Sequence, residues 1–253
     1  MPPRTDFFDL TIHSGYPFPH VHRTVHPKDG MYVDNPRHYL NVGRNAVDLI
    51  ARHQPAAASI LDIPCGFGRV TRTIKARFPD ARLTVCDIDD QGVEFCAKTF
   101  NARGVQSHAD FNKLELHEKY DVIWVGSLIT HLDANAVFSF FKFILRHLNA
   151  SGRAIISSHG AFVAGRLFQS KIEKRKNYGI SSENVAAMVD AYFASGFGYA
   201  PYDSNQLGGT SYGISICNEN WLRRKVQEAG AKVISFEEHA WDNHHDIIVV
   251  AAQ

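Results

Sequence analysis

The run Leu61-Asp62-Ile63-Pro64-Cys65-Gly66-Phe67-Gly68-Arg69 starts in an apolar stretch and passes through two glycines. Residues 59–63 are typical of a buried strand, the glycines permit a tight turn, and residues 70–78 have helical spacing. Such a strand, turn and helix start direct backbone N–H groups at a ligand. The next apolar run ends at Asp87, whose carboxylate is placed to accept both hydroxyls of a ribose. The spacing therefore predicts a site for a nucleoside-containing cofactor.

Two classes of cofactor use this layout, and two residues distinguish them. A dinucleotide fingerprint needs a third glycine, but Thr71 stands at that position. Asp62 would repel a pyrophosphate, whereas it suits a cofactor with a cationic amino group. S-adenosylmethionine carries both an ammonium and a sulfonium. These residues favour it over NAD, so a nicotinamide oxidoreductase is the weaker alternative.

At these positions the chain resembles the class I S-adenosylmethionine-dependent methyltransferases, whose first motif is an acidic residue followed by G-x-G-x-G. Asp62, Gly66 and Gly68 match that motif. Pro64 replaces the usual first glycine, which stiffens the turn and removes one backbone donor. The resemblance implies S-adenosylmethionine as the cofactor. It also implies a Rossmann-like α/β fold with a seven-stranded sheet, parallel except for a reversed last strand.

The periodicity of the chain favours the same fold class. Strand and helix patterns alternate from residue 36 to residue 158, which is typical of a parallel sheet with helices on both faces. A helix over 221–229 and strands over 232–236 and 246–252 match the hairpin that closes the methyltransferase sheet. The predicted strands before that hairpin are 59–63, 82–87, 105–108, 120–125 and 153–158, and the predicted helices are 36–53, 70–78, 91–101 and 133–148.

Ligands of such sheets bind at the carboxyl ends of the strands. Asp110 follows the third strand and, by resemblance, suits an adenine amino group, although a turn-forming role is expected equally. Phe111 or Ile88 would pack on the adenine ring. The segment from Gly126 to His131 resembles the fourth-strand motif of small-molecule methyltransferases. The predicted cofactor residues are Asp62, Pro64, Cys65, Gly66, Phe67, Gly68, Asp87, Ile88, Asp110, Phe111, Gly126 and Ser127.

Three histidines fall at predicted active-site ends and are candidates for a catalytic base: His159, His245 and His131, in that order of expected reach. An alcohol is a poor nucleophile until a base accepts its proton, and histidine has a suitable pKa. The histidines therefore favour methylation of oxygen, although each has a structural alternative. A neutral amine would need only alignment. Because no carboxylate cluster joins these residues, no metal site is expected.

Residues 36–253 are interpreted as one domain, preceded by an arm over residues 1–35 and interrupted by an insertion at about 160–214. The arm contains prolines and scattered histidines, so no regular element is expected there, and we expect it to help capture the acceptor. The insertion should contain a basic helix, a second helix near 182–195 and a loop over 196–202. The linker 237–245 lies on the active-site side of the last hairpin, which draws attention to Trp241.

Composition limits the function classes. The chain has 253 residues, 45% hydrophobic and 21% charged, which suffices for the core of one enzyme domain. A net charge of +1 argues against a nucleic-acid partner. Cys65, Cys86, Cys96 and Cys217 form no C-x-x-C pair, which favours free thiols in a reducing compartment. Without an apolar leader or a membrane-length run, we expect a cytoplasmic protein.

A narrower resemblance concerns the acceptor. The segments 64–69, 126–131, 212–215 and 241–246 resemble methyltransferase domains associated with bacterial glycosyltransferases and polysaccharide biosynthesis. This resemblance implies a small-molecule or glycan acceptor and a glycosyltransferase as a pathway partner. The alternatives are an N-methyltransferase of small molecules and a non-catalytic S-adenosylmethionine-binding scaffold.

Overall fold

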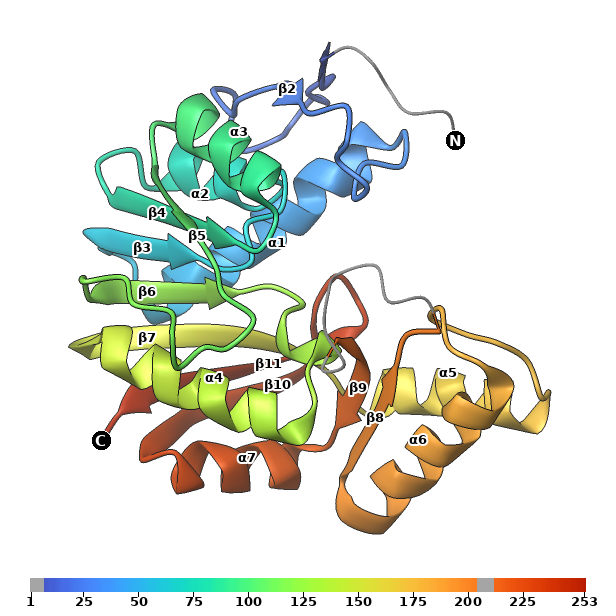
Figure 1. Ribbon diagram of the computed structural model, residues 1–253. Helices are drawn as coiled ribbons and strands as arrows, with labels where there is room; N and C mark the ends of the chain where they lie inside the picture. The colour runs from blue at the N-terminus through green and yellow to red at the C-terminus, as the bar shows by residue number, and fades with distance from the viewer. Residues whose placement is uncertain (1–6, 204–211) are drawn as a thin grey trace.

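A seven-stranded sheet runs through the centre of the computed structural model, which describes residues 7–203 and 212–253 (Figure 1). Its strand order is β10-β11-β7-β6-β3-β4-β5. Only β11 runs against its neighbours, since it pairs antiparallel with both β7 and β10. The predicted fold class is therefore confirmed. The strands are β3 (Ser59–Asp62), β4 (Arg82–Asp87), β5 (Arg103–Gln106), β6 (Tyr120–Val125), β7 (Leu148–His159), β10 (Ala231–Trp241) and β11 (His245–Ala252).

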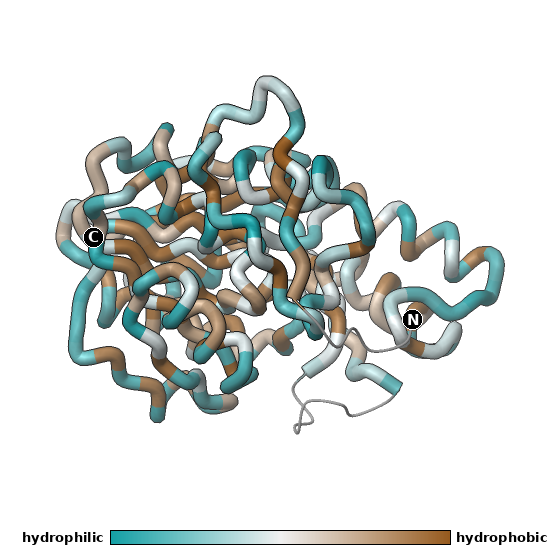
Figure 2. The backbone as a smooth tube through the Cα atoms, turned by 90° about the horizontal axis from the view of Figure 1, so that it is seen from above, coloured by the Kyte–Doolittle hydropathy of each residue, from teal (hydrophilic) through white to brown (hydrophobic). Residues whose placement is uncertain are grey.

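Helices cover both faces of this sheet, and each face has its own hydrophobic cluster. On one face, α1 (Pro36–His53), α2 (Thr71–Arg77) and α3 (Asp90–Phe100) pack on the strands. On the other, α4 (Ala134–His147) and α7 (Glu219–Glu228) do so. Figure 2 shows the hydrophobic residues concentrated along the central strands. Burial on both faces explains why these strands read as continuous apolar runs.

The junction of α4 and β7 differs from the prediction. Asp133 caps α4 as expected, because its carboxylate accepts hydrogen bonds from the N–H groups of Asn135 and Ala136, both at 2.9 Å. The helix ends at His147, and β7 begins at once with Leu148, which pairs with Tyr120. The predicted strand started at residue 153. It began too late because residues 149–152, Asn-Ala-Ser-Gly, are small or polar and give no strand signal, although they belong to β7 where its register with β6 shifts.

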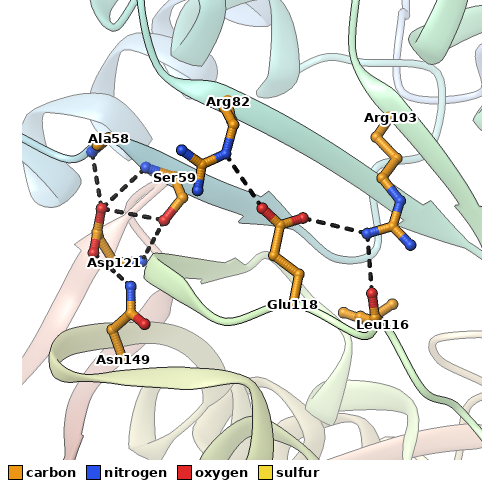
Figure 3. Close-up of polar contacts among 8 residues, drawn as sticks. All are labelled: Ala58, Ser59, Arg82, Arg103, Leu116, Glu118, Asp121 and Asn149. Atoms are coloured by element: carbon orange, nitrogen blue, oxygen red, sulfur yellow. Dashed lines mark hydrogen bonds and ion pairs between the residues drawn. The ribbon is translucent and has the colours of Figure 1, made fainter.

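Polar contacts join the amino ends of the strands, away from the predicted site (Figure 3). The Asp121 carboxylate accepts hydrogen bonds from the backbone N–H groups of Ala58 and Ser59 at 2.9 and 3.0 Å and from the Asn149 amide at 2.7 Å. Glu118 contacts Arg82 at 3.4 Å and Arg103 at 3.2 Å. These contacts hold the starts of β3, β4, β5 and β6 together and leave the carboxyl ends for a ligand.

The predicted insertion packs around a hydrophobic cluster of its own. It comprises α5 (Ala161–Ile172), α6 (Ser182–Ser195) and a hairpin of β8 (Phe197–Pro201) with β9 (Gly213–Cys217). The loop predicted over 196–202 is wrong, because most of it forms β8. Small buried residues, Gly198 and Ala200, alternate with larger exposed or half-buried ones, and that alternation is invisible in a hydropathy pattern. Residues 204–211 of the insertion lie outside the described residues.

The arm also contains a short pair of strands, β1 (Phe8–Asp9) and β2 (Thr24–Val25), where no regular element was expected. Leu10, Val21 and Val25 are buried against the start of α1. The arm therefore packs on the domain through its own apolar cluster. Its residues 1–6 lie outside the described part of the chain.

All four cysteines are buried and free, as predicted. Within residues 7–203 and 212–253, none of the helices combines the length and the apolar character needed to cross a membrane.

Candidate cofactor pocket and histidine cluster

A cavity of about 470 Å³ opens at the carboxyl ends of β3, β4 and β6, where the topology places ligands. A short 3-10 helix, η1 (Ile129–His131), follows β6 at its edge. The lining groups come from the glycine turn, the end of β4, the segments after β5 and β6, the arm, the residue before β9 and the end of β10. They include Asp29, Met31, Pro64, Cys65, Gly66, Phe67, Arg69, Asp87, Ile88, Phe111, Gly126, Ser127, His131, Tyr212 and Trp241.

The glycine turn adopts the backbone conformation for which its residues were singled out. Gly66 and Gly68 have positive φ values of 49° and 81°. At Gly68 a side chain is also excluded by packing, because a Cβ would lie 2.4 Å from Cε2 of Phe100. The turn therefore needs glycine at both positions.

Asp87 connects this turn to the end of β4. Its Oδ2 accepts a hydrogen bond from the Gly66 N–H at 2.8 Å, and its Oδ1 accepts one from the Asp89 N–H at 3.0 Å. Burial raises the pKa of Asp87, and these hydrogen bonds oppose that rise. The carboxylate lines the cavity with acceptor capacity left for ligand hydroxyls.

The carboxylate of Asp62 is buried beside the turn, and one of its oxygens lacks a hydrogen-bond partner among the described residues. Its side chain is 1% exposed, its Oδ2 accepts from the Thr71 hydroxyl at 2.5 Å, and its Oδ1 has no hydrogen-bond partner among the described residues. Burial raises its pKa to about 7, while the Thr71 bond lowers it and the charge of Asp87 raises it further. A cationic ligand group near this carboxylate would stabilise its charged form. Thr71, which broke the dinucleotide fingerprint, holds Asp62 in place.

The structure brings most of the predicted cofactor residues together. Asp62, the last residue of β3, and Gly68, in the turn, do not line the cavity, and Asp110 does not line it either. The Asp110 Oδ1 instead accepts hydrogen bonds from the backbone N–H and the side-chain amide of Asn112, both at 3.0 Å, as in a turn-forming residue. The predicted residues that line the cavity are Pro64, Cys65, Gly66, Phe67, Asp87, Ile88, Phe111, Gly126 and Ser127.

Of the three predicted bases, only His131 lines the cavity. Its Nδ1 lies 2.9 Å from the Gly213 carbonyl oxygen and 2.7 Å from the Tyr202 hydroxyl, and its ring stacks on Tyr212 with centroids 5.1 Å apart. Burial lowers the pKa of His131, and the bond to Gly213 partly opposes this shift. The imidazole is therefore neutral at pH 7.

His159 and His245 face each other across the β7–β11 pair, outside the cavity lining. Both are buried, with ring centroids 4.8 Å apart. Desolvation, reinforced by neighbouring histidines, lowers the pKa of His159 to about 3 and that of His245 to about 2. His245 reaches towards the cavity through Ser127, whose Oγ lies 3.4 Å from Nε2. The sequence ranked His159 first and His131 last as candidate bases, whereas only His131 lines the cavity.

Several lining residues were not among the predicted site residues. Trp241 lies at the active-site side as its linker position indicated, and its Nε1–H donates to the Val42 carbonyl at 3.0 Å. The Arg69 guanidinium lies 5.8 Å from the Trp241 ring centroid. Asp29 lines the cavity from the arm, where its Oδ2 accepts from the Tyr39 hydroxyl at 2.5 Å. Nothing in the local sequence around Asp29 indicates this tertiary contact.

Comparisons with known proteins agree with this site. A family model described as "Methyltransferase domain" matches residues 61–154, which contain the glycine turn, Asp87 and β6. The fold resembles a crystal structure of an S-adenosylmethionine-dependent methyltransferase from Clostridium acetobutylicum, with a TM-score of 0.57, 11% identity, and coverage of 84% of this chain and 92% of that one. The chain therefore has the fold of these methyltransferases, and its residues 61–154 match the methyltransferase-domain family model. These matches agree with the predicted S-adenosylmethionine site.

The curated relatives match this chain only in part. A malonyl-[acyl-carrier protein] O-methyltransferase from Acetivibrio thermocellus is 30% identical over 112 residues, which cover 38% of this chain and 40% of the relative. A ribosomal RNA small subunit methyltransferase C from Salmonella choleraesuis is 29% identical over 100 residues, covering 37% of this chain and 29% of the relative. The chain thus spans less than half the length of the curated relatives it matches.

Proposed function

We propose that this protein transfers a methyl group from S-adenosylmethionine to an oxygen of a sugar or another small polar metabolite. When bound, the cofactor supplies an electrophilic methyl group on a sulfonium. Asp87 would hold the ribose, the glycine turn would present backbone N–H groups, and Asp62 would face the cationic amino end. The protein's further task is to align an acceptor oxygen and to remove its proton.

The protonation state of His131 is the main observation that supports an oxygen acceptor. A carbonyl oxygen can only accept a hydrogen bond, so the 2.9 Å contact with Gly213 favours the tautomer with the ring proton on Nδ1. Nε2 then has a free lone pair. Because burial also keeps the ring neutral, His131 is suited to accept the proton of an alcohol.

The residues around His131 favour a small polar acceptor. Tyr212 and Trp241 provide aromatic faces, and Ser127 and Arg69 provide polar groups in the same cavity. The cavity volume falls in the range of small-molecule pockets. The net charge of +1 gives no support for an RNA acceptor, despite the name of one relative. A glycosyltransferase that makes or extends the acceptor would be the pathway partner.

A nitrogen acceptor is the second candidate, and one observation favours it. The Tyr202 hydroxyl lies 2.7 Å from His131 Nδ1 and could donate to it. In that tautomer the proton would be on Nε2, which would then act as a donor that orients the acceptor. A neutral amine aligned in this way would react without a base.

Variants of His131 distinguish the two candidates. With an acceptor identified by screening sugars and small amines for methyl transfer, we expect His131→Asn to lower kcat about 10²–10⁴-fold. Calorimetry with S-adenosylhomocysteine should show nearly unchanged affinity, because the role of His131 is confined to the acceptor. His117→Asn, at an exposed histidine outside the cavity, is the matched control and should keep full activity.

The pH profile provides a second test. With His131 as the base, kcat/KM should hold through the ordinary range of a histidine pKa and fall only at more acidic pH, because burial lowers the pKa of this imidazole. An amine acceptor with full activity in His131→Asn would support the nitrogen alternative. Tight cofactor binding without turnover of any acceptor would instead favour the non-catalytic scaffold.

A further inference from the structure

Three histidines gather where β7 ends and the β10–β11 hairpin turns. His159 is the last residue of β7, His244 lies in the hairpin turn, and His245 is the first residue of β11. One ring nitrogen from each lies within 4.8 Å of those of the other two. The antiparallel register places His245 directly opposite His159, so residues far apart in the sequence meet at one point.

Two of these rings leave a buried nitrogen unused. His159 and His245 are 5% and 4% exposed, and the Nδ1 atom of each has no hydrogen-bond partner among the described residues. Buried polar atoms are normally paired, so two unpaired imidazole nitrogens side by side need an explanation. A shared ligand would satisfy both of them at once.

In His245 and His244, one ring nitrogen contacts a neighbouring oxygen atom. His245 Nε2 lies 3.4 Å from the Ser127 hydroxyl, and His244 Nδ1 lies 2.6 Å from the Asp242 carbonyl oxygen. Metal-binding histidines commonly use one ring nitrogen for the ion and the other for such a hydrogen bond, which fixes the ring and its tautomer. His244 Nε2 and the Nδ1 atoms of His159 and His245 are then the nitrogens left for a ligand.

We infer that His159, His244 and His245 bind a divalent first-row transition-metal ion, with Zn²⁺ as the representative case. Three imidazoles form the donor set, and no carboxylate from residues 7–203 or 212–253 belongs to the cluster. Zn²⁺ and its neighbours in the series prefer nitrogen donors, whereas Mg²⁺ and Ca²⁺ prefer oxygen. Three protein ligands also leave a coordination position open for water or another ligand.

The site adjoins the cofactor cavity without forming part of its wall. Ser127 lines the cavity and contacts His245, and the Trp241 ring, also in the wall, lies 5.0 Å from the His245 ring. An ion bound here would place positive charge directly behind the part of the cavity wall that Ser127 and Trp241 form. The inference does not depend on the proposed methyl acceptor, because it concerns binding of the ion itself.

Metal titration of the whole chain tests this inference. After removal of metal with a chelator, we expect one equivalent of Zn²⁺ to bind in calorimetry and Co²⁺ to give ligand-field absorption bands. His244→Asn should weaken binding at least 10–100-fold, the loss typical even of an outer-shell partner. His244 is preferred because it is half-buried, whereas substitution of the two fully buried rings risks misfolding. His239→Asn removes a neighbouring histidine outside the cluster and should leave Zn²⁺ affinity unchanged.

Circular dichroism of the metal-free variants should show that both remain folded, so that lost binding reports on the site. The inference is overturned if the wild-type chain does not bind Zn²⁺ or Co²⁺ stoichiometrically. It is also overturned if His244→Asn binds as tightly as wild type, or if Mg²⁺ competes with Zn²⁺ on equal terms.

Discussion

The backbone N–H of Gly66 donates a hydrogen bond to Oδ2 of Asp87 at 2.8 Å, so the turn after β3 and the end of β4 are held as one unit. The same carboxylate lines the cavity. Its position is therefore fixed before a ligand arrives, and the proposed contact with a ribose would require little reorganisation. Preorganisation of this kind lowers the free-energy cost of binding.

Replacement of Asp87 tests this placement. Asp87→Ala should lose two hydrogen bonds from ribose hydroxyls to a charged acceptor, each contributing about 1.5–3 kcal/mol. We expect the affinity for S-adenosylhomocysteine in calorimetry to fall by roughly 100-fold or more. The matched control is Asp90→Ala, at an exposed carboxylate three residues along the chain, and it should change the affinity little. Unchanged affinity in Asp87→Ala would place the ribose elsewhere.

The buried carboxylate of Asp62 predicts a pH-dependent affinity. Its folded-state pKa, raised to about 7, means that ionisation is suppressed between the ordinary carboxyl pKa and pH 7, and the unliganded protein loses stability as the pH rises through that interval. A ligand ammonium favours the charged form. Binding of S-adenosylhomocysteine should therefore tighten as the pH rises through about 7, with proton release detectable by calorimetry in buffers of different ionisation enthalpy.

Asp62→Asn supplies the control for this prediction. The variant should bind S-adenosylhomocysteine more weakly and lose the pH dependence near 7. Its affinity for 5′-methylthioadenosine, which lacks the amino-acid group, should stay close to that of wild type. If both ligands weakened equally, Asp62 would act by supporting the turn and not by facing the amino group.

The parallel core was predictable because its signals are local. The bounds predicted for β4 and β6 match the structure, as does the 36–53 helix, since each is a continuous pattern with a clear end. Asp87 and the glycine turn were identified in the same way, from spacing along adjacent strands. The path of β8 was missed because its buried positions are glycine and alanine, whose contribution depends on the packing of α6 against them.

The histidine cluster and the arm could not be derived in this way. His159 and His245 meet only through the register of an antiparallel pair, and register is a tertiary property. Asp29 reaches the cavity because Tyr39 holds its carboxylate, a contact that no local pattern specifies. The sequence indicated that histidines would gather at this edge of the sheet. It did not indicate which of them would be buried side by side with unpaired ring nitrogens.

Arg72 should be a major determinant of stability, because its buried guanidinium joins the arm to α2. It donates hydrogen bonds to the carbonyls of His22 at 2.7 Å and Thr24 at 3.0 Å. Arg72→Met would leave these acceptors unpaired at about 1–3 kcal/mol each. We expect Tm to fall by roughly 5–15 °C, at about 2–4 °C per kcal/mol, with faster proteolysis near residues 22–24. Arg77→Met, at the exposed end of the same helix, should change Tm by only a degree or two. A small shift for Arg72→Met would show that the arm docks independently of these bonds.

Replacement by alanine should have opposite effects on stability at two helical glycines, Gly92 and Gly165. Gly92 in α3 packs against the glycine turn, and a Cβ there would lie 2.6 Å from the Gly66 carbonyl oxygen. Because Gly66 also donates to Asp87, displacement of this backbone should disturb the ribose site. We expect Gly92→Ala to destabilise the fold by about 1–3 kcal/mol, as overpacking does, and to weaken S-adenosylhomocysteine binding in calorimetry. Gly165 in α5 is exposed, and a Cβ there would have no neighbour within 4 Å among the described residues. Gly165→Ala should therefore stabilise the protein by about 0.5–1 kcal/mol in urea unfolding, since alanine restricts the unfolded chain and favours helix. A neutral effect of Gly92→Ala on both stability and affinity would show that the turn can shift away from α3 without cost, against the close packing described here.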